Sequence, residues 1–229
     1  NPLHIGTIES LCAAKFPAIV SRFREHHPQV KLQITVETPE ELIRMMEHDQ
    51  LDIIYILDAP RWSESWVKAM EVAEPVVFVA SPAFWAQKYA ECEKNGTVKW
   101  STKTVGQEEI SVRQITLDQI LQEPFFLTEK NANYRQALDQ HLASCRCCLS
   151  PVLEISDTAF IIQMLEQSRG LSFLPLFAVQ KQIWEGTLAA VEVDDVEISM
   201  YRQIFYHKNK FRTREMEQFI IFASEEENH

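Results

Sequence analysis

The side chains with the most reactive chemistry in this sequence gather in one short segment. Cys145, Cys147 and Cys148 follow closely after His141. Thiolates at this spacing could bind a soft metal ion or form a redox pair, and the positive charge of Arg146 favours such chemistry. Adjacent Cys147 and Cys148 cannot readily bridge each other without strain, however, and the sequence contains no second Cys or His cluster to complete a tetrahedral metal site. We therefore expect these cysteines to be small, partly buried loop residues, with a thiol or metal sensor as an alternative.

Signatures of catalysis are missing from the sequence. It contains no G-x-S-x-G nucleophile motif, no P-loop, no dinucleotide fingerprint and no H-E-x-x-H zinc motif. We therefore expect no enzyme activity, no catalytic residue, no cofactor and no bound metal ion.

Small hydroxyl side chains stand where the expected strands end and the expected helices begin. Such hydroxyls donate and accept hydrogen bonds at close range, so they can orient a small ligand. The alternative is that they are helix N-caps and turn residues, which is the commonest use of Ser and Thr. The candidates are Thr7, Ser10, Thr38, Thr128 and Ser156.

The same loops carry several carboxylates. Helix N-termini favour an anion, but a group of carboxylates facing the ligand would repel a simple dicarboxylate. We therefore expect a neutral, zwitterionic or cationic ligand. The alternative is that Glu9 and Asp157 only stabilise their own helix N-termini. The carboxylates concerned are Glu9, Glu37, Asp58, Glu129 and Asp157.

Alternating strands and helices must position these side chains. From Leu3 to Leu57 the pattern reads strand, helix, strand, helix, strand, which requires a parallel sheet with crossover helices. Ligands of open parallel sheets gather outside the carboxyl ends of the strands. The expected strands are 3–7, 31–36, 53–57, 76–80, 125–128, 152–155, 170–174 and 200–207. The expected helices are 10–27 with Ser10 as N-cap, 40–47, 116–121, 134–143, 176–184 and 213–223, and one after the N-cap Asp157 to Gln167.

The stretch from Phe84 to Arg113 is the least regular part of the pattern. It contains Gly96 and Gly106 within a polar mixture of residues. This composition predicts a short helix and a hairpin at the periphery of a lobe.

Composition excludes several classes of protein. The 229 residues, 46% hydrophobic and 24% charged, are typical of a globular protein with either one large domain or two lobes. No apolar run approaches the roughly 18 residues that span a bilayer. A net charge of −11 argues against a basic DNA-binding face on this chain. Five cysteines, an odd number, do not resemble a secreted disulfide framework, so we expect a cytoplasmic location.

Several short motifs occur in a characteristic order along the chain. Together they resemble the effector-binding region of the bacterial LysR-type transcriptional regulators, over nearly the whole sequence. Thr38, Asp49 and Ser168 depart from the family pattern, which has glycine at these positions, and Phe84 to Arg113 looks longer than in the family. The matching residues are Gly6 with Pro17, Phe23 with Pro28, Leu51-Asp52, Pro75 to Val79 before Ser81-Pro82, Thr116-Leu117 with Pro124-Phe125, and Gly170 with Leu174-Pro175.

The resemblance implies an α/β fold with two Rossmann-like lobes of the type 2 periplasmic-binding-protein kind, joined by two crossing strands. Lobe one would be residues 1–77 with 202–229, and lobe two residues 78–201. A small-molecule effector would bind in the cleft between the lobes and alter oligomer geometry and transcription. The resemblance adds Ile8, Leu174 and Pro175 to the expected effector contacts, and Ile8 would make the pocket floor more apolar.

The resemblance also implies a longer protein. Asn1 and Pro2 lead directly into a strand without an initiator Met, so we expect a piece cut at a domain boundary. The absent part would be an N-terminal winged helix-turn-helix, the only part to contact DNA, and the assembly would be a homodimer or tetramer without membrane contact. The alternative within the same fold class is a secreted solute-binding protein of a transporter.

Overall fold

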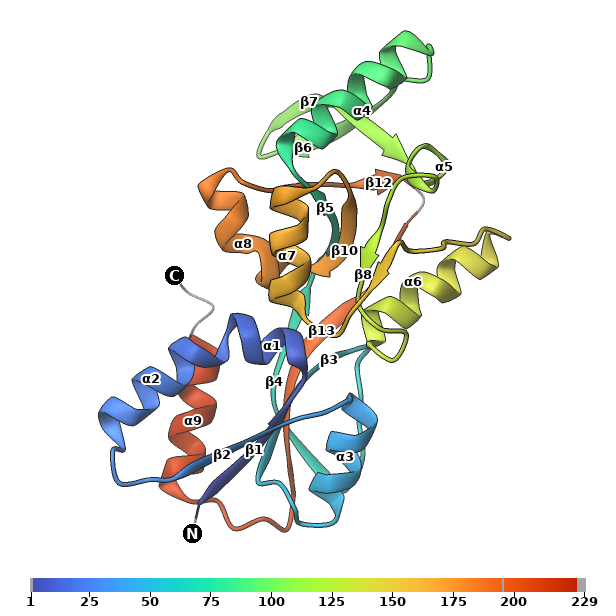
Figure 1. Ribbon diagram of the computed structural model, residues 1–229. Coiled ribbons are helices and arrows are strands. Elements are labelled where there is room, and N and C mark those ends of the chain that lie inside the picture. The colour runs from blue at the N-terminus through green and yellow to red at the C-terminus, as the bar shows by residue number, and fades with distance from the viewer. Residues whose placement is uncertain (1, 195, 226–229) are drawn as a thin grey trace. The chain divides into compact units, whose positions relative to one another are not determined.

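The computed structural model describes residues 2–194 and 196–225, which form two units (Figure 1). Unit 1 contains the chain up to Pro75, the short segment Asn131–Tyr134, and the chain from Ser199 onward. Unit 2 contains Val76–Lys130 and Arg135–Ile198. These limits differ from the expected lobes by a few residues at each crossing and by the segment Asn131–Tyr134.

Unit 1 is built on a five-stranded mixed sheet with the order β2-β1-β3-β13-β4. Its first half is parallel, as predicted, because β1 (Leu3–Thr7) pairs in parallel with both β2 (Leu32–Val36) and β3 (Ile53–Asp58). The second half, which involves strands outside the stretch from Leu3 to Leu57 for which parallel pairing was predicted, is antiparallel. In this half β13 (Met200–His207) lies between β3 and β4 (Trp66–Glu74). The sequence pattern did not predict β4, which lies at the sheet edge and is only partly buried.

The predicted helix from Ser10 to His27 is two helices, α1 (Glu9–Ala14) and α2 (Phe16–His26). Pro17 stands in the first turn of α2, where its missing N–H costs nothing, but it cannot continue the hydrogen-bond ladder of α1. The remaining helices of unit 1 are α3 (Pro39–Glu47) and α9 (Arg214–Glu225).

Aromatic rings form the core between α2 and α9. Phe16, Phe23 and Phe219 are almost fully buried, and the Phe219 ring centroid lies 5.9 Å from that of Phe16 and 5.8 Å from that of Phe23. On β1, a Cβ added at Gly6 would lie 2.6 Å from a methyl carbon of Leu42 and equally close to one of Leu51. Glycine therefore lets α3 pack directly against the strand that leads to the expected site.

Unit 2 contains several small sheets. Its central strand, β5 (Val76–Ala80), pairs antiparallel with β10 (Leu171–Pro175) and with β11 (Ala189–Val191). Further strands of unit 2 are β8 (Phe126–Leu127), β9 (Leu153–Glu154) and β12 (Val193–Asp194). Its helices include α5 (Leu117–Ile120), α6 (Asn133–Ser144), α7 (Thr158–Gln167) and α8 (Leu176–Glu185), with the start of α6 falling in unit 1.

The predicted helix and hairpin between Phe84 and Arg113 are confirmed, but the helix has 13 residues and is not short. Helix α4 (Pro82–Lys94) is followed by the hairpin of β6 (Lys99–Val105) and β7 (Glu108–Thr116). Gly106 in the turn has φ of 67°, and a Cβ added there would meet nothing within 4 Å. The hairpin tip is therefore open to solvent.

Candidate functional site

In unit 1, Thr7 ends β1 and is fully buried. Its Oγ1 donates to the carbonyl oxygen of Tyr55 at 2.8 Å, and its own carbonyl accepts from the N–H of Glu37 at 3.1 Å. Thr7 thus fastens β1 to its two neighbours at their carboxyl ends. This role is structural, and it fixes the position of the loop that follows.

The loop after β1 leads into α1, which begins at Glu9 with Ile8 as N-cap. The expectation that Ser10 caps this helix is therefore wrong, because the N-cap lies two residues earlier, at Ile8, and Ser10 lies in the first turn. Ser10 is 2% exposed, and among residues 2–194 and 196–225 its Oγ has no hydrogen-bond partner. A buried hydroxyl without a partner is costly, so Ser10 is a strong candidate for a ligand contact.

The loop after β2 carries Glu37 and Thr38. Thr38 is the N-cap of α3, and its Oγ1 accepts from the N–H of Glu41 at 3.4 Å. Pro39 follows at the first helical position, as predicted. Thr38 therefore has a capping role, while the Glu37 side chain is exposed.

In unit 2, Thr128 follows β8 and is 4% exposed. Its carbonyl accepts from Arg135 Nη1 at 2.7 Å, and Arg135 also bonds Glu154 at 2.9 Å. Its Oγ1, in contrast, has no hydrogen-bond partner within the described parts of the chain. The Thr128 backbone is thus fixed while its buried hydroxyl stays available to a ligand.

The other predicted residues of unit 2 divide into two groups. Ser156 and Asp157 are exposed, and Asp157 caps α7 by accepting from the N–H of Phe160 at 3.0 Å, as predicted. Leu174 and Pro175 are buried in β10, opposite Val77 and Val76 of β5. Leu174 is fully buried, which places its side chain in the core of unit 2.

Two buried polar side chains were missed in the sequence. Ser172 is fully buried in the middle of β10, and Asn133 is 7% exposed at the start of α6. In the part of the chain that the structure describes, neither the Ser172 hydroxyl nor the Asn133 amide has a hydrogen-bond partner. The sequence could have identified Ser172, because it is a serine within the apolar strand LSFLP.

The cysteine cluster lies just beyond the C-terminal end of α6. Cys145 and Cys148 are exposed, so the expectation that they fill space in a partly buried loop is wrong for both. Cys145 Sγ lies 3.8 Å from Nε2 of His141, one helical turn earlier. Within the residues described, no group of three or more His, Cys, Asp or Glu side chains is arranged to hold a metal ion. The geometry therefore supports accessible thiols rather than a metal centre.

A family model described as the LysR substrate binding domain matches residues 1–93 and 108–227. The unmatched residues 94–107 contain β6. Among curated proteins, the chain is 21% identical over 212 residues to the HTH-type transcriptional activator CmpR of Synechocystis, and 24% identical over 221 residues to the uncharacterized regulator YwqM of Bacillus subtilis. These alignments cover 92% and 95% of this chain, but only 62% of CmpR and 66% of YwqM.

Solved structures show the same fold. The regulatory domain of HypT from Salmonella typhimurium matches with a TM-score of 0.68 at 15% identity, over 98% of this chain and 94% of that one. The CcmR regulatory domain of Synechocystis, solved in complex with 2-PG, matches with a TM-score of 0.67 at 15% identity, over 97% and 95%. The predicted two-lobed, periplasmic-binding-protein-like α/β fold is therefore confirmed. No helix in the described ranges combines the length and apolar character that crossing a membrane requires.

Proposed function

This chain belongs to the LysR substrate-binding domain family, and on that premise we propose that it is the ligand-sensing part of a DNA-binding transcription factor. The match of the family model to segments of both units is the observation that carries the proposal. Because the chain spans only 62% of CmpR, DNA binding is assigned to a separate N-terminal winged helix-turn-helix. The net charge of −11 is consistent with this assignment, because an acidic chain is unsuited to binding DNA phosphates itself.

The effector is proposed to bind at the loops that follow the strands of both units. Support comes from the buried hydroxyls of Ser10 and Thr128, which have no partner among the described residues and would gain one from a ligand. Glu9, Glu37 and Asp157 on the same loops favour a neutral, zwitterionic or cationic effector. The full proposed set is Thr7, Ile8, Glu9, Ser10, Glu37, Thr38, Thr128, Ser156, Asp157, Leu174 and Pro175.

A ligand screen on residues 1–229 tests this proposal, with melting temperature as the first readout and calorimetry as the second. For any effector found, Ser10→Ala and Thr128→Val should weaken binding while leaving the fold intact. Ser81→Ala is the matched control, because Ser81 Oγ caps α4 by accepting from the N–H of Phe84. It should lower stability without changing affinity. Unchanged affinity in both site variants would place the effector elsewhere.

The whole protein is proposed to be a cytoplasmic homodimer or tetramer without enzyme activity. The curated relatives named above are transcriptional regulators, which supports this assignment. A gel shift with the longer protein tests DNA binding, because phosphate contacts make the affinity fall steeply with salt. Salt-sensitive binding would support the regulator. A lack of DNA affinity, together with a signal peptide encoded upstream of residue 1, would indicate the secreted solute-binding protein instead.

A thiol sensor is the second candidate function, since Cys145 is exposed beside His141. Mild oxidation that changes DNA affinity, and is lost in Cys145→Ser, would support this role. Affinity that is unaffected by oxidation would remove it.

A further inference from the structure

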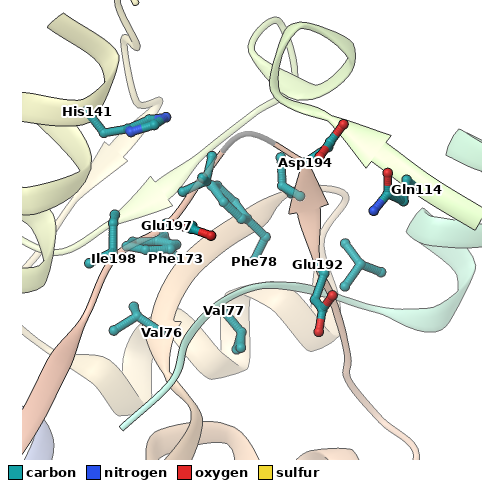
Figure 2. Close-up of a pocket in the computed structure, with 13 residues that line it drawn as sticks. Val76, Val77, Phe78, Gln114, His141, Phe173, Glu192, Asp194, Glu197 and Ile198 are labelled. Atoms are coloured by element: carbon teal, nitrogen blue, oxygen red, sulfur yellow. The ribbon is translucent and has the colours of Figure 1, made fainter. Parts of the chain in front are cut away.

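Unit 2 contains a pocket that shares no residue with the proposed effector site. Its volume is about 680 Å³, which lies within the range of roughly 300 to 1,000 Å³ that is usual for small-molecule sites. Strands β5, β7, β10, β11 and β12, helix α6 and the segment 196–198 contribute its walls (Figure 2). All the described lining residues belong to unit 2.

One side of the pocket is apolar. Phe78 of β5 and Phe173 of β10 are buried, and their ring centroids lie 4.8 Å apart. Val76, Val77 and Val191 continue this surface. Such a wall suits the aromatic or aliphatic body of an organic ligand rather than a bare ion.

The charged lining residues all carry the same sign. Glu192, Asp194 and Glu197 supply three carboxylates, and the described lining includes neither lysine nor arginine. Glu192 forms an ion pair with Lys103 of β6. Within the described ranges, Asp194 and Glu197 have no ion-pair partner. As far as the described residues show, the pocket therefore combines two carboxylates that lack a counter-charge with an apolar wall.

Two neutral or weakly basic polar groups complete the lining. His141 of α6 and Gln114 of β7 lie on opposite sides of Phe78 in the view of Figure 2. The amide of Gln114 can donate and accept, so it can fix the orientation of a ligand. No set of three metal-ligating side chains is found in the described residues, which argues against a metal ion as the occupant.

We propose that this pocket is a second ligand site, which binds an organic cation with an amine or guanidinium group and an apolar body. The cationic group pairs with Asp194 and Glu197, and the body packs against Phe78 and Phe173. An anion would face three carboxylates, and a purely apolar ligand would leave two of them without a partner. This inference does not depend on the proposed function.

Calorimetry on residues 1–229 tests the proposal with ligands matched in shape and different in charge. 2-Phenylethylamine and phenylguanidine are the cations, 2-phenylethanol is the neutral counterpart, and 3-phenylpropanoate is the anion. We expect saturable binding of at least one cation, weaker binding of the alcohol and none of the anion. The cation affinity should fall as salt is raised, because partly exposed carboxylates are screened.

Two variants locate the binding. Asp194→Asn with Glu197→Gln should weaken cation binding about tenfold, as expected for the loss of two partly exposed charge contacts. Glu166→Gln is the control, since Glu166 is an exposed carboxylate on α7 of the same unit. It should leave the affinity unchanged, and so should Ser10→Ala in the proposed effector site.

Three results would overturn the proposal. The first is that neither cation shows saturable binding, and the second is that alcohol and cation bind equally. The third is cation binding that survives the double substitution in a folded protein, as judged by circular dichroism. None of these results bears on an effector bound through Ser10 and Thr128, so the two proposals fail separately.

Discussion

Arg202 and Glu74 form a buried ion pair across the neighbouring strands β13 and β4. Arg202 Nε lies 2.8 Å from Glu74 Oε2, and Arg202 Nη1 donates to the Tyr55 hydroxyl at 2.9 Å. The two residues are 4% and 7% exposed. The antiparallel half of the unit 1 sheet, of which the sequence pattern predicted β13 but not β4, is thus joined to the parallel half through polar side chains.

Glu74→Gln should lower the free energy of unfolding by about 3 kcal/mol, because the substitution removes a carboxylate charge that pairs with a buried guanidinium. Urea denaturation followed by circular dichroism measures this loss. Glu71→Gln on the same strand is the control, since the Lys68–Glu71 pair is partly exposed and should contribute no more than about 1 kcal/mol. Equal losses in the two variants would contradict the structural role of the buried pair.

Glu123 should make the stability of unit 2 depend on pH. Burial alone would raise the pKa of its carboxyl, but hydrogen bonds from Arg169 and Lys88 outweigh burial and lower it below the ordinary 4.5. The folded state then binds fewer protons than the unfolded state, so this contribution is present above pH 4.5 and is lost as pH falls through the lowered pKa.

Glu123→Gln should therefore lower the free energy of unfolding by about 1 to 3 kcal/mol at pH 7, because the buried Lys88 loses a charged partner 2.6 Å away. The difference in the free energy of unfolding between the variant and the natural chain should shrink as the pH falls from 7 towards 4 and below. Urea denaturation at several pH values across this range measures that difference. A difference that stays constant with pH would mean that the Glu123 charge is not involved.

The five cysteines should react with an aromatic disulfide at very different rates. Cys145 and Cys148 are exposed and should react first, while buried Cys92 should react only as the protein opens. Burial and, to a smaller extent, the Glu9 carboxylate raise the pKa of the Cys12 thiol, so less thiolate forms and its reaction should be slow near pH 8. Peptide mapping after timed labelling checks this order, and uniform labelling would refute it.

The edge strand β2 is expected to take part in a homodimer. Ile34 and Val36 are 36% and 44% exposed on this strand. Val36→Lys should shift the sedimentation of the dimer towards the monomer with little change in melting temperature. Val105→Lys is the control, because Val105 is 60% exposed at the hairpin tip of unit 2. Dissociation in the control, or none in Val36→Lys, would count against this interface.

Substitutions on the inner face of α2 do not test the dimer. Ile19 and Phe23 are fully buried in the core of unit 1, and Phe23 packs against Phe219. Ile19→Glu should therefore unfold unit 1, because it buries an unpaired carboxylate. If the variant instead unfolds cooperatively at a temperature close to that of the natural chain, the helix must be able to turn this face towards solvent.

Local patterns in the sequence predicted the elements that are regular and deeply buried. The alternation from Leu3 to Leu57 identified β1, β3 and α3, because each buries much of its apolar surface. It also identified β2, whose polar and apolar residues alternate although none of them is buried. It did not separate α1 from α2, because the apolar face continues across the break. Pro17, which is tolerated only in the first turn of a helix, was the available sign that a new helix begins there. Strand β4 was not predicted, because it lies at the sheet edge and exposes many of its side chains.

The sequence identified the loops of the candidate site better than the role of each hydroxyl. Thr7 bonds the carbonyl of a residue 48 positions away, and no local pattern predicts such a partner. Ser10 and Thr128 have no hydrogen-bond partner among the described residues, whereas Thr7 and Thr38 each have one. Whether a buried hydroxyl finds a partner depends on tertiary packing. The lobe boundaries, the N-terminal domain and the effector contacts stay predictions.

The open tip of the β6–β7 hairpin offers a practical handle on this protein. Residues 94–107 fall outside the family match, and no described residue comes within 4 Å of a Cβ added at Gly106. A fluorescent label or a short affinity tag inserted after Gly106 would therefore extend from an exposed turn. Such a label could immobilise the chain for binding measurements, or report its rotation in solution, while both candidate ligand sites stay unmodified.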